Sequence, residues 1–222
     1  MICLFSFSSP VFRNVASKYD YNLNKQCIII DAGHGGFDGG AVASDGTVEK
    51  DINLSISLKL YEMLKLFGYD VIMTRTTDDA TDNTESNIIS ERKKSDLKER
   101  LKIINNTKDG VFVSVHLNKF TTSTAIGAQV FYSPNNPKSV NLGQKIQTSV
   151  VSLIQKDNAR TVKKGNKNTY LLYNAQIPAV IVECGFLSNS NELLLLKDID
   201  YQSKMAFAIF CGIQEYFKSG EK

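Results

Sequence analysis

Three nearly unbroken apolar runs stand out along the chain, and each has the length of a single strand. They are residues 27–31, 111–115 and 179–182. Such runs are typical of strands that are covered on both faces, as in a parallel sheet with helices on either side. Shorter segments at residues 69–74 and 129–132 predict two further strands.

Between these runs, apolar residues recur at the three- and four-residue spacing of amphipathic helices. We expect Thr47 to cap the first of these helices and Gly68 to end it. Residues 76–94 are polar and predict a long surface loop at a rim of the site. Strands followed by helices predict an α/β fold with a mostly parallel central sheet and helices on both faces. The spacing predicts helices over residues 52–67, 97–104, 142–154 and 201–217.

The composition fits one globular domain with a sizeable core. The chain has 222 residues, 42% of them hydrophobic, and a formal net charge of only +3. Its basic residues are scattered, which argues against a nucleic-acid-binding face. No apolar run approaches the ~20 residues of a membrane span. The cysteines form no C-x-x-C pair, and we interpret Cys3, Cys27, Cys184 and Cys211 as core thiols rather than disulfide partners or metal ligands.

Residues 1–25 are interpreted as a leader that precedes the folded domain. The first seven residues are mostly apolar, but they lack the basic segment and the small-residue cleavage site of a complete export signal. We therefore expect the remnant of an export signal, with an ordinary disordered leader as the alternative.

A histidine set among glycines follows the first predicted strand. Gly33, Gly35 and Gly36 allow the backbone to turn sharply around His34. His34 is therefore expected at the carboxyl end of a buried strand, where open α/β sheets keep their ligand sites. Taken alone, this stretch is equally consistent with a ligand to a bound group and with a packed histidine in a tight turn.

The second of the two histidines and an acidic residue occupy equivalent positions. His116 follows one apolar run and Glu183 follows another, so both should face the same cleft as His34. Glu49 falls in the first turn of the helix after the His34 loop, on the same edge. Its simple structural explanation is the helix dipole, which favours an acid there. Two imidazoles with one carboxylate are a common catalytic zinc set, and a second carboxylate is what acid–base catalysis requires.

At this point the chain resembles a known family, the zinc-dependent N-acetylmuramoyl-L-alanine amidases of the type 3 group. The resemblance covers roughly residues 27–217 and is closest to the short sporulation and germination amidases of the spore cortex. It rests on Ile-Ile-Asp-Ala-Gly-His-Gly-Gly at 29–36, Glu-Lys-Asp at 49–51, Ser-Val-His-Leu-Asn at 114–118 and Pro-Ala-Val-Ile-Val-Glu-Cys-Gly-Phe-Leu-Ser-Asn at 178–189.

The resemblance implies a sheet of about six strands and a catalytic domain over residues 26–222. It also implies that His34, Glu49 and His116 bind Zn²⁺ and that Glu183 is the catalytic glutamate. The implied reaction is cleavage of the amide between the lactyl group of N-acetylmuramic acid and L-alanine in peptidoglycan. The expected location is outside the cytoplasm, at the cell wall, a periplasm-like space or the spore cortex.

Two rival functions remain open. One keeps the metal site but changes the substrate, giving a zinc peptidase or a small-molecule deacylase. The other is a non-catalytic module that binds the cell wall. Because the three ligands are scattered along the chain and metal binding couples to folding, we also expect a regulatory partner protein that supports metal affinity.

Supporting roles are assigned to a few further residues. Asp31 and Asn118 flank the ligands and are candidates to orient an imidazole, with turn formation or capping as the alternative. Arg75 and Arg100 are predicted to make structural ion pairs rather than to hold substrate. The basic segment 160–167 is interpreted as a solvated surface loop, with contact to an anionic wall polymer as the alternative.

Overall fold

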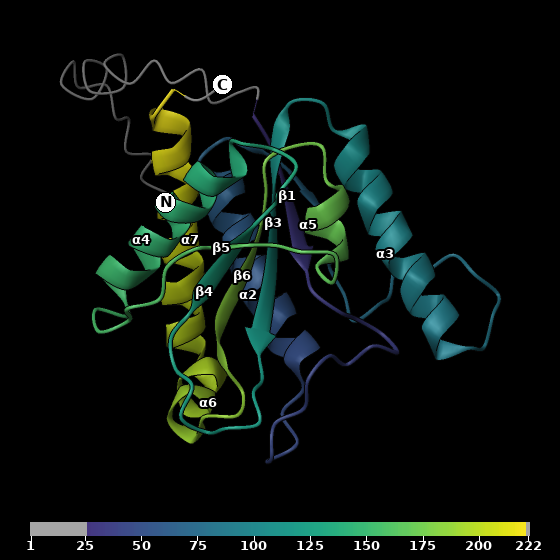
Figure 1. Ribbon diagram of the computed structural model, residues 1–222, viewed down its shortest axis with the longest axis horizontal. Helices are drawn as coiled ribbons and strands as arrows, with labels where there is room; N and C mark the ends of the chain where they lie inside the picture. Colours follow the sequence, from purple (N-terminus) through teal and green to yellow (C-terminus); the bar gives the residue numbers. More distant parts are fainter. Residues whose placement is uncertain (1–25, 221–222) are drawn as a thin grey trace, which may run out of the picture.

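The computed structural model describes residues 26–220 and contains a six-stranded sheet with the strand order β2-β1-β3-β6-β4-β5. All neighbouring strands are parallel except β4 and β6, which are antiparallel. The prediction of a mostly parallel sheet in an α/β fold is therefore confirmed (Figure 1). The strands are β1 (Cys27–Ala32), β2 (Asp70–Met73), β3 (Gly110–Asn118), β4 (Gln129–Tyr132), β5 (Lys163–Lys164) and β6 (Ala179–Phe186).

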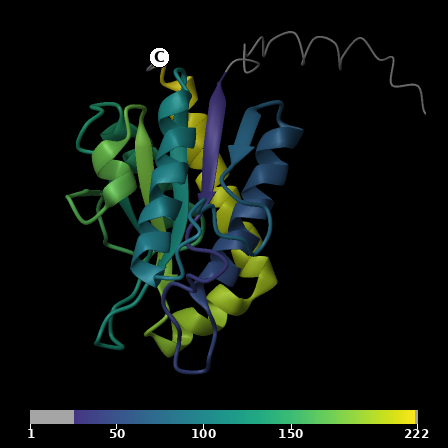
Figure 2. The same ribbon diagram turned by 90° about the vertical axis from the view of Figure 1, so that its right-hand side faces the viewer.

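Helices cover both faces of the sheet, as Figure 2 shows in side view. The alternation of side chains along β1 feeds two separate cores. Ile28 and Ile30 join the larger core beneath α2, α4, α6 and α7, whereas Ile29 joins a smaller core beneath α3 and α5. The helices are α2 (Glu49–Leu66), α3 (Ile89–Asn106), α4 (Ser139–Leu153), α5 (Tyr170–Asn174), α6 (Ser190–Lys197) and α7 (Ile199–Lys218).

Two of the central strands are longer than their apolar runs. β3 continues to Asn118 and β6 continues to Phe186, so His116 and Glu183 lie within strands rather than just after them. The apolar patterns end early because the site occupies one face of each strand. Side chains on that face are polar, while the opposite face stays in the larger core through residues such as Leu117 and Cys184.

Helix α3 begins at Ile89, inside the segment that was predicted to be loop. Its first turns carry no apolar stripe because they face solvent and are tied down by polar contacts. Arg92 donates to Asp82, and Ser86 donates to Glu91. The spacing of apolar residues therefore predicted only residues 97–104, the half of α3 that packs on the sheet.

Three smaller differences concern element boundaries and short elements. The N-cap of α2 is Val48 rather than Thr47, and it makes no capping hydrogen bond through its side chain. Helix α6 was not predicted, although the side chain of Asn189 caps it by accepting from the amides of Asn191 and Glu192. The two-residue strand β5 is too short to leave a pattern.

Some predictions fall outside the described residues. The proposed leader at residues 1–25 and Cys3 belong to this group. Within residues 26–220, Cys27, Cys184 and Cys211 are free thiols. Cys184 is buried in the larger core, whereas Cys27 and Cys211 are half-buried and pack against the edges of the two cores. None of the helices described there is long and apolar enough to cross a membrane.

Candidate metal centre

His34 lies on a loop at the carboxyl end of β1 and has an unusual backbone conformation. Its φ angle is 63°, and within residues 26–220 it is the one non-glycine residue with positive φ. An L-residue in this left-handed region costs roughly 1–2 kcal/mol. Gly35 and Gly36 continue the turn with φ angles of 138° and 54°. The loop thus needs support from its surroundings to hold the imidazole in place.

Two buried arginines provide that support by donating to the carbonyls of residues 32–34. Arg75 donates to the carbonyls of Ala32 and Gly33 at 2.8 and 3.1 Å. Arg100 donates to the carbonyls of Ala32 and His34 at 3.0 and 2.7 Å. The two guanidinium groups therefore fix the backbone path that presents His34.

The predicted ion pairs of these arginines are confirmed for one of them. Arg100 is 2% exposed and pairs with Asp31 at 2.5 Å and with Asp96 at 2.7 Å. Arg75 instead bonds four backbone carbonyl groups, those of Ala32 and Gly33 and two others, and forms no ion pair within the described residues. Four carbonyl oxygens satisfy its donors in place of a carboxylate.

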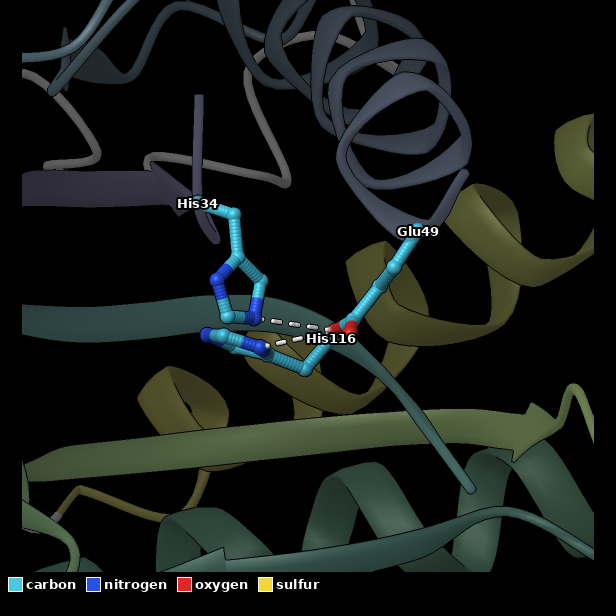
Figure 3. Close-up of side chains that lie close together, drawn as sticks. All are labelled: His34, Glu49 and His116. Carbon is cyan, nitrogen blue, oxygen red and sulfur yellow. Dashed lines mark hydrogen bonds and ion pairs between the residues drawn. The ribbon is translucent and has the colours of Figure 1, made fainter. Parts of the chain in front are cut away.

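Glu49 connects the two histidines. Its Oε1 atom lies 3.0 Å from His116 Nδ1 and 3.4 Å from His34 Nε2, as Figure 3 shows. The same oxygen accepts from the amide of Leu117, and Oε2 accepts from the amide of Ala41. Candidate ligand atoms of His34, Glu49 and His116 all lie within 4.8 Å of one another. The structure thus brings together the three residues that the sequence nominated.

Two glycines leave room for this cluster. A Cβ atom at Gly33 would lie 2.3 Å from the Cε1 and Nε2 atoms of His116. A Cβ atom at Gly40 would lie 2.6 Å from both Glu49 Oε2 and His34 Cδ2. The backbone of the 33–40 loop is therefore packed directly against the candidate ligands.

Asp38, which the sequence analysis did not single out, holds the other side of the His34 ring. Asp38 Oδ2 lies 2.8 Å from His34 Nδ1, and Asp38 Oδ1 lies 2.8 Å from the Nζ atom of Lys93. A carboxylate behind a metal-binding histidine fixes the ring orientation and raises its basicity. The signal in the sequence was an acid four residues after a histidine in a glycine-rich turn.

The charged groups of this cluster shift one another's pKa values. Burial lowers the pKa of His34, but the hydrogen bonds and charges of Asp38 and Glu49 outweigh it and raise that pKa to about 9. For Glu49, burial raises the pKa. Hydrogen bonds from His116 and His34 outweigh the effect of burial and lower the pKa of Glu49 well below its usual range. The carboxylates of Asp38 and Glu49 therefore favour a positive charge on the His34 ring.

The donor set fits a metal ion of the zinc type. Two imidazole nitrogens and one carboxylate oxygen are the ligands that catalytic zinc sites use, with a further position left for water or substrate. The cradle formed by Gly33 and Gly40 and the carboxylate behind His34 are consistent with such a site.

Glu183 stands beside this cluster. It is the direct partner of His116 in the parallel pairing of β3 and β6. Its Oε2 atom is buried and has no hydrogen-bond partner among the described residues. Burial raises the pKa of Glu183, the charge of His116 lowers it and that of Glu49 raises it again, and the result is about 7. A carboxyl group that can gain or lose a proton near neutral pH therefore lies next to the candidate metal ligands.

The two candidate orienting residues have other surroundings. Asp31 accepts hydrogen bonds from Thr74, Ser114 and Arg100, not from an imidazole. It acts on His34 indirectly, because Arg100 also donates to the carbonyl of His34. The backbone carbonyl of Asn118 accepts from the amide of Leu187, and its side chain makes no hydrogen bond within the described part of the chain.

Comparisons with known proteins identify a family and close relatives. Residues 28–215 match the family model described as N-acetylmuramoyl-L-alanine amidase. The germination-specific N-acetylmuramoyl-L-alanine amidase of Bacillus subtilis (strain 168) is 35% identical over 222 residues, covering 98% of this chain and 91% of that protein.

Two solved structures are similar in sequence and in fold. The CwlD amidase from Clostridioides difficile, solved in complex with the GerS lipoprotein, is 44% identical with a TM-score of 0.84, over 87% of this chain and 99% of that chain. An N-acetylmuramoyl-L-alanine amidase from Clostridium difficile 630 is 31% identical with a TM-score of 0.75, over 88% of this chain and 98% of that chain.

Proposed function

Because this chain belongs to the N-acetylmuramoyl-L-alanine amidase family, we propose that it hydrolyses the amide between the lactyl group of N-acetylmuramic acid and L-alanine of the stem peptide. The observation that carries the proposal is the cluster of His34, Glu49 and His116 with Glu183 beside it on the neighbouring strand. The catalytic domain is proposed to span residues 26–222, and the family match covers 28–215.

The metal is proposed to be zinc, held by His34, Glu49 and His116. When bound, zinc supplies a water of lowered pKa and polarises the carbonyl that is attacked. Asp38 keeps the His34 ring in the orientation that points its Nε2 atom at Glu49. The two arginines hold the strained backbone of the same loop and so position His34.

Glu183 is proposed to carry the proton in both steps. Its carboxylate accepts a proton from the attacking water and then donates it to the departing amine of L-alanine. Burial of Glu183 raises its pKa and favours the neutral form, so the carboxyl group can hold the proton between the two steps. The unpartnered Oε2 atom supports this role, because a purely structural buried carboxylate would have its oxygens satisfied.

The two rival functions are less well supported. A peptidase or deacylase would keep the same metal cluster, but the family match extends over residues 28–215 and concerns amidases of peptidoglycan. A non-catalytic wall-binding module would have no need for the unpartnered carboxyl oxygen of Glu183 beside the ligands. Hydrolysis of the muramoyl amide is the function supported both by the cluster and by the family match.

The setting is proposed from the relatives. One is named germination-specific, and another was solved with a lipoprotein bound. We therefore expect this chain to act outside the cytoplasm on peptidoglycan, with the spore cortex as its substrate and a lipoprotein as its regulatory partner.

Digestion of purified cortex peptidoglycan tests the proposal. The zinc-loaded chain should release stem peptides that begin with a free L-alanine amine, and His116→Ala should release none. Simple acylamino acids and unlinked peptides should stay intact under the same conditions. Cleavage of those compounds without release of stem peptides would favour the peptidase or deacylase instead.

A further inference from the structure

The site continues across the sheet on the side of Glu183 that faces away from the metal ligands. Glu183 pairs with His116 on β3 and with Gln129 on β4. The residues that follow His116 and Glu183, and Val130 after Gln129, all belong to the larger core. Because side chains alternate along a strand, His116, Glu183 and Gln129 point to the opposite face. They form one row, with Glu183 in the middle.

An arginine lies at the far end of this row. Arg160 donates from Nη1 to Gln129 Oε1 at 3.2 Å and from Nε to the carbonyl of Ile126 at 2.6 Å. Its Cζ atom lies 4.6 Å from the centroid of the Phe186 ring. Gln129 is held in turn by its own bond to the carbonyl of Thr161. The guanidinium group is therefore fixed in position by a carbonyl, an amide and an aromatic ring.

Arg160 has no acidic partner within ion-pair distance among the described residues. Arg92 and Arg100, in contrast, each pair with at least one aspartate. Burial raises the pKa of Glu192, and the charge of Arg160 offsets only part of this. The Glu192 oxygens accept from the amides of Gly127 and Phe186, not from Arg160. A half-buried guanidinium with fixed geometry and an unused Nη2 suits a carboxylate supplied by a ligand.

A second cation lies on the same face of the sheet. Lys163 on β5 is exposed and pairs in register with Phe131, two residues after Gln129 on β4. Register partners share a face of the sheet, so Lys163 and Gln129 lie on the same face. The metal cluster lies on one side of Glu183, and these two cations lie on the other.

We propose that Arg160, positioned by Gln129 and Phe186, is a subsite for a carboxylate of the stem peptide on the amine side of the scissile amide. This inference rests on the proposed function. If the scissile carbonyl faces the metal ligands and Glu183 gives its proton to the amine, the leaving peptide extends past Glu183 toward β4. Arg160 is the charged group fixed along that path.

A matched pair of substrates tests the proposal without any variant. Both carry L-Ala-D-Glu on the muramic acids of a synthetic tetrasaccharide, with the γ-carboxyl blocked as a methylamide in each. One has a free α-carboxylate and the other an α-carboxamide. A charge-assisted hydrogen bond predicts that the zinc-loaded chain prefers the carboxylate by about 10- to 100-fold in kcat/KM. Arg160→Gln should reduce this preference to near unity. Arg160→Lys should keep part of it, and Lys156→Gln, an exposed neighbour, should keep all of it.

The outcomes distinguish failure of the carboxylate subsite from failure of the proposed function. Equal cleavage of both substrates by the unmodified chain would overturn the subsite while leaving the proposed function intact. Equal slowing of both substrates in Arg160→Gln would mean that Arg160 only holds the 126–129 segment. If the zinc-loaded chain cleaves neither substrate nor cortex peptidoglycan, the proposed function itself fails, and the subsite falls with it.

Discussion

His116 and Glu183 are direct partners in the parallel register of β3 and β6, and their side chains lie on the same face of the sheet. The backbone separation between a metal ligand and the proposed acid–base group is thus set by strand pairing, at the last regular pair before the register of β3 and β6 shifts. A loop could not fix the two groups as closely. A substitution that keeps the shape of Glu183 but removes its ability to transfer a proton should therefore affect catalysis without moving the neighbouring metal ligand.

Glu183→Gln is expected to separate catalysis from metal binding. The amide keeps the shape of the side chain but cannot accept the proton of the attacking water, so the rate of stem-peptide release should fall by about 10²- to 10⁴-fold. Bound zinc, measured on the purified chain, should stay equimolar. Glu215→Gln, an exposed control on α7, should change neither quantity. Loss of zinc together with activity would place Glu183 among the ligands instead.

Asp38→Asn is expected to weaken metal binding without unfolding the chain. The carboxylate that faces His34 Nδ1 would become a weaker acceptor, and replacing such a group lowers metal affinity by roughly 10- to 100-fold. Competition with a chromophoric chelator measures this affinity directly. Asp45→Asn changes an exposed carboxylate that contacts Lys197 and the amide of Thr47 but no candidate ligand, and it should leave the affinity unchanged. An unaltered zinc affinity in Asp38→Asn would show that the His34 ring needs no such support.

Gly33→Ala is expected to displace His116. The added Cβ atom would come within 2.3 Å of the imidazole, and the ring is the group that can move. Zinc affinity and activity should both fall, while the sheet stays folded because the φ angle of Gly33 lies outside the left-handed region. Gly143→Ala in α4 meets only ordinary contacts at 3.4 Å and serves as the matched control. Full zinc affinity in Gly33→Ala would mean that His116 is not a ligand.

Much of this site could be predicted from the sequence because its residues end or interrupt apolar runs. His34, His116 and Glu183 were nominated by that position, and Glu49 by the first turn of a helix. Parallel strands bring their carboxyl ends to one edge, so separation along the chain did not hide the cluster.

The supporting residues could not be found in the same way. The contact between Asp38 and His34 depends on the path of a loop with three positive φ angles, at His34, Gly35 and Gly36. The role of Arg100 depends on α3 crossing close to β1, and no local pattern reports the distance between elements so far apart in sequence. Pattern reading finds residues that the secondary structure positions, whereas tertiary packing decides which groups hold them.

Arg100→Met is expected to destabilise the fold as well as the site. Removal of the guanidinium leaves the carboxylates of Asp31 and Asp96 without their buried cation, and breaking such a pair costs about 3–5 kcal/mol. Urea unfolding of the metal-free chain measures this loss. Lys102→Met on the same helix removes a surface ion pair with Glu99 and should leave stability nearly unchanged. A loss as small as that of Lys102→Met would contradict a structural role for Arg100.

Acid should weaken the same network through Asp31. Burial raises the pKa of Asp31, but the charge of Arg100 and the hydrogen bond from Ser114 outweigh it and lower the pKa from 3.8 to about 2. A carboxyl whose pKa is lower in the folded state stabilises the fold above its unfolded pKa and loses that effect as the pH falls through the folded pKa. The shift corresponds to about 2 kcal/mol, lost between roughly pH 4 and pH 2.

Comparison of the unmodified chain with Asp31→Asn isolates this contribution from that of other acids. The difference in unfolding free energy between the two, measured without metal by urea titration, should shrink by about 2 kcal/mol from pH 5 to pH 2. Asp109→Asn, at an exposed position, controls for the loss of one negative charge. A difference that stays constant over this range would mean that Asp31 titrates alike in the folded and unfolded chains, and that its contact with Arg100 contributes no pH-dependent stability.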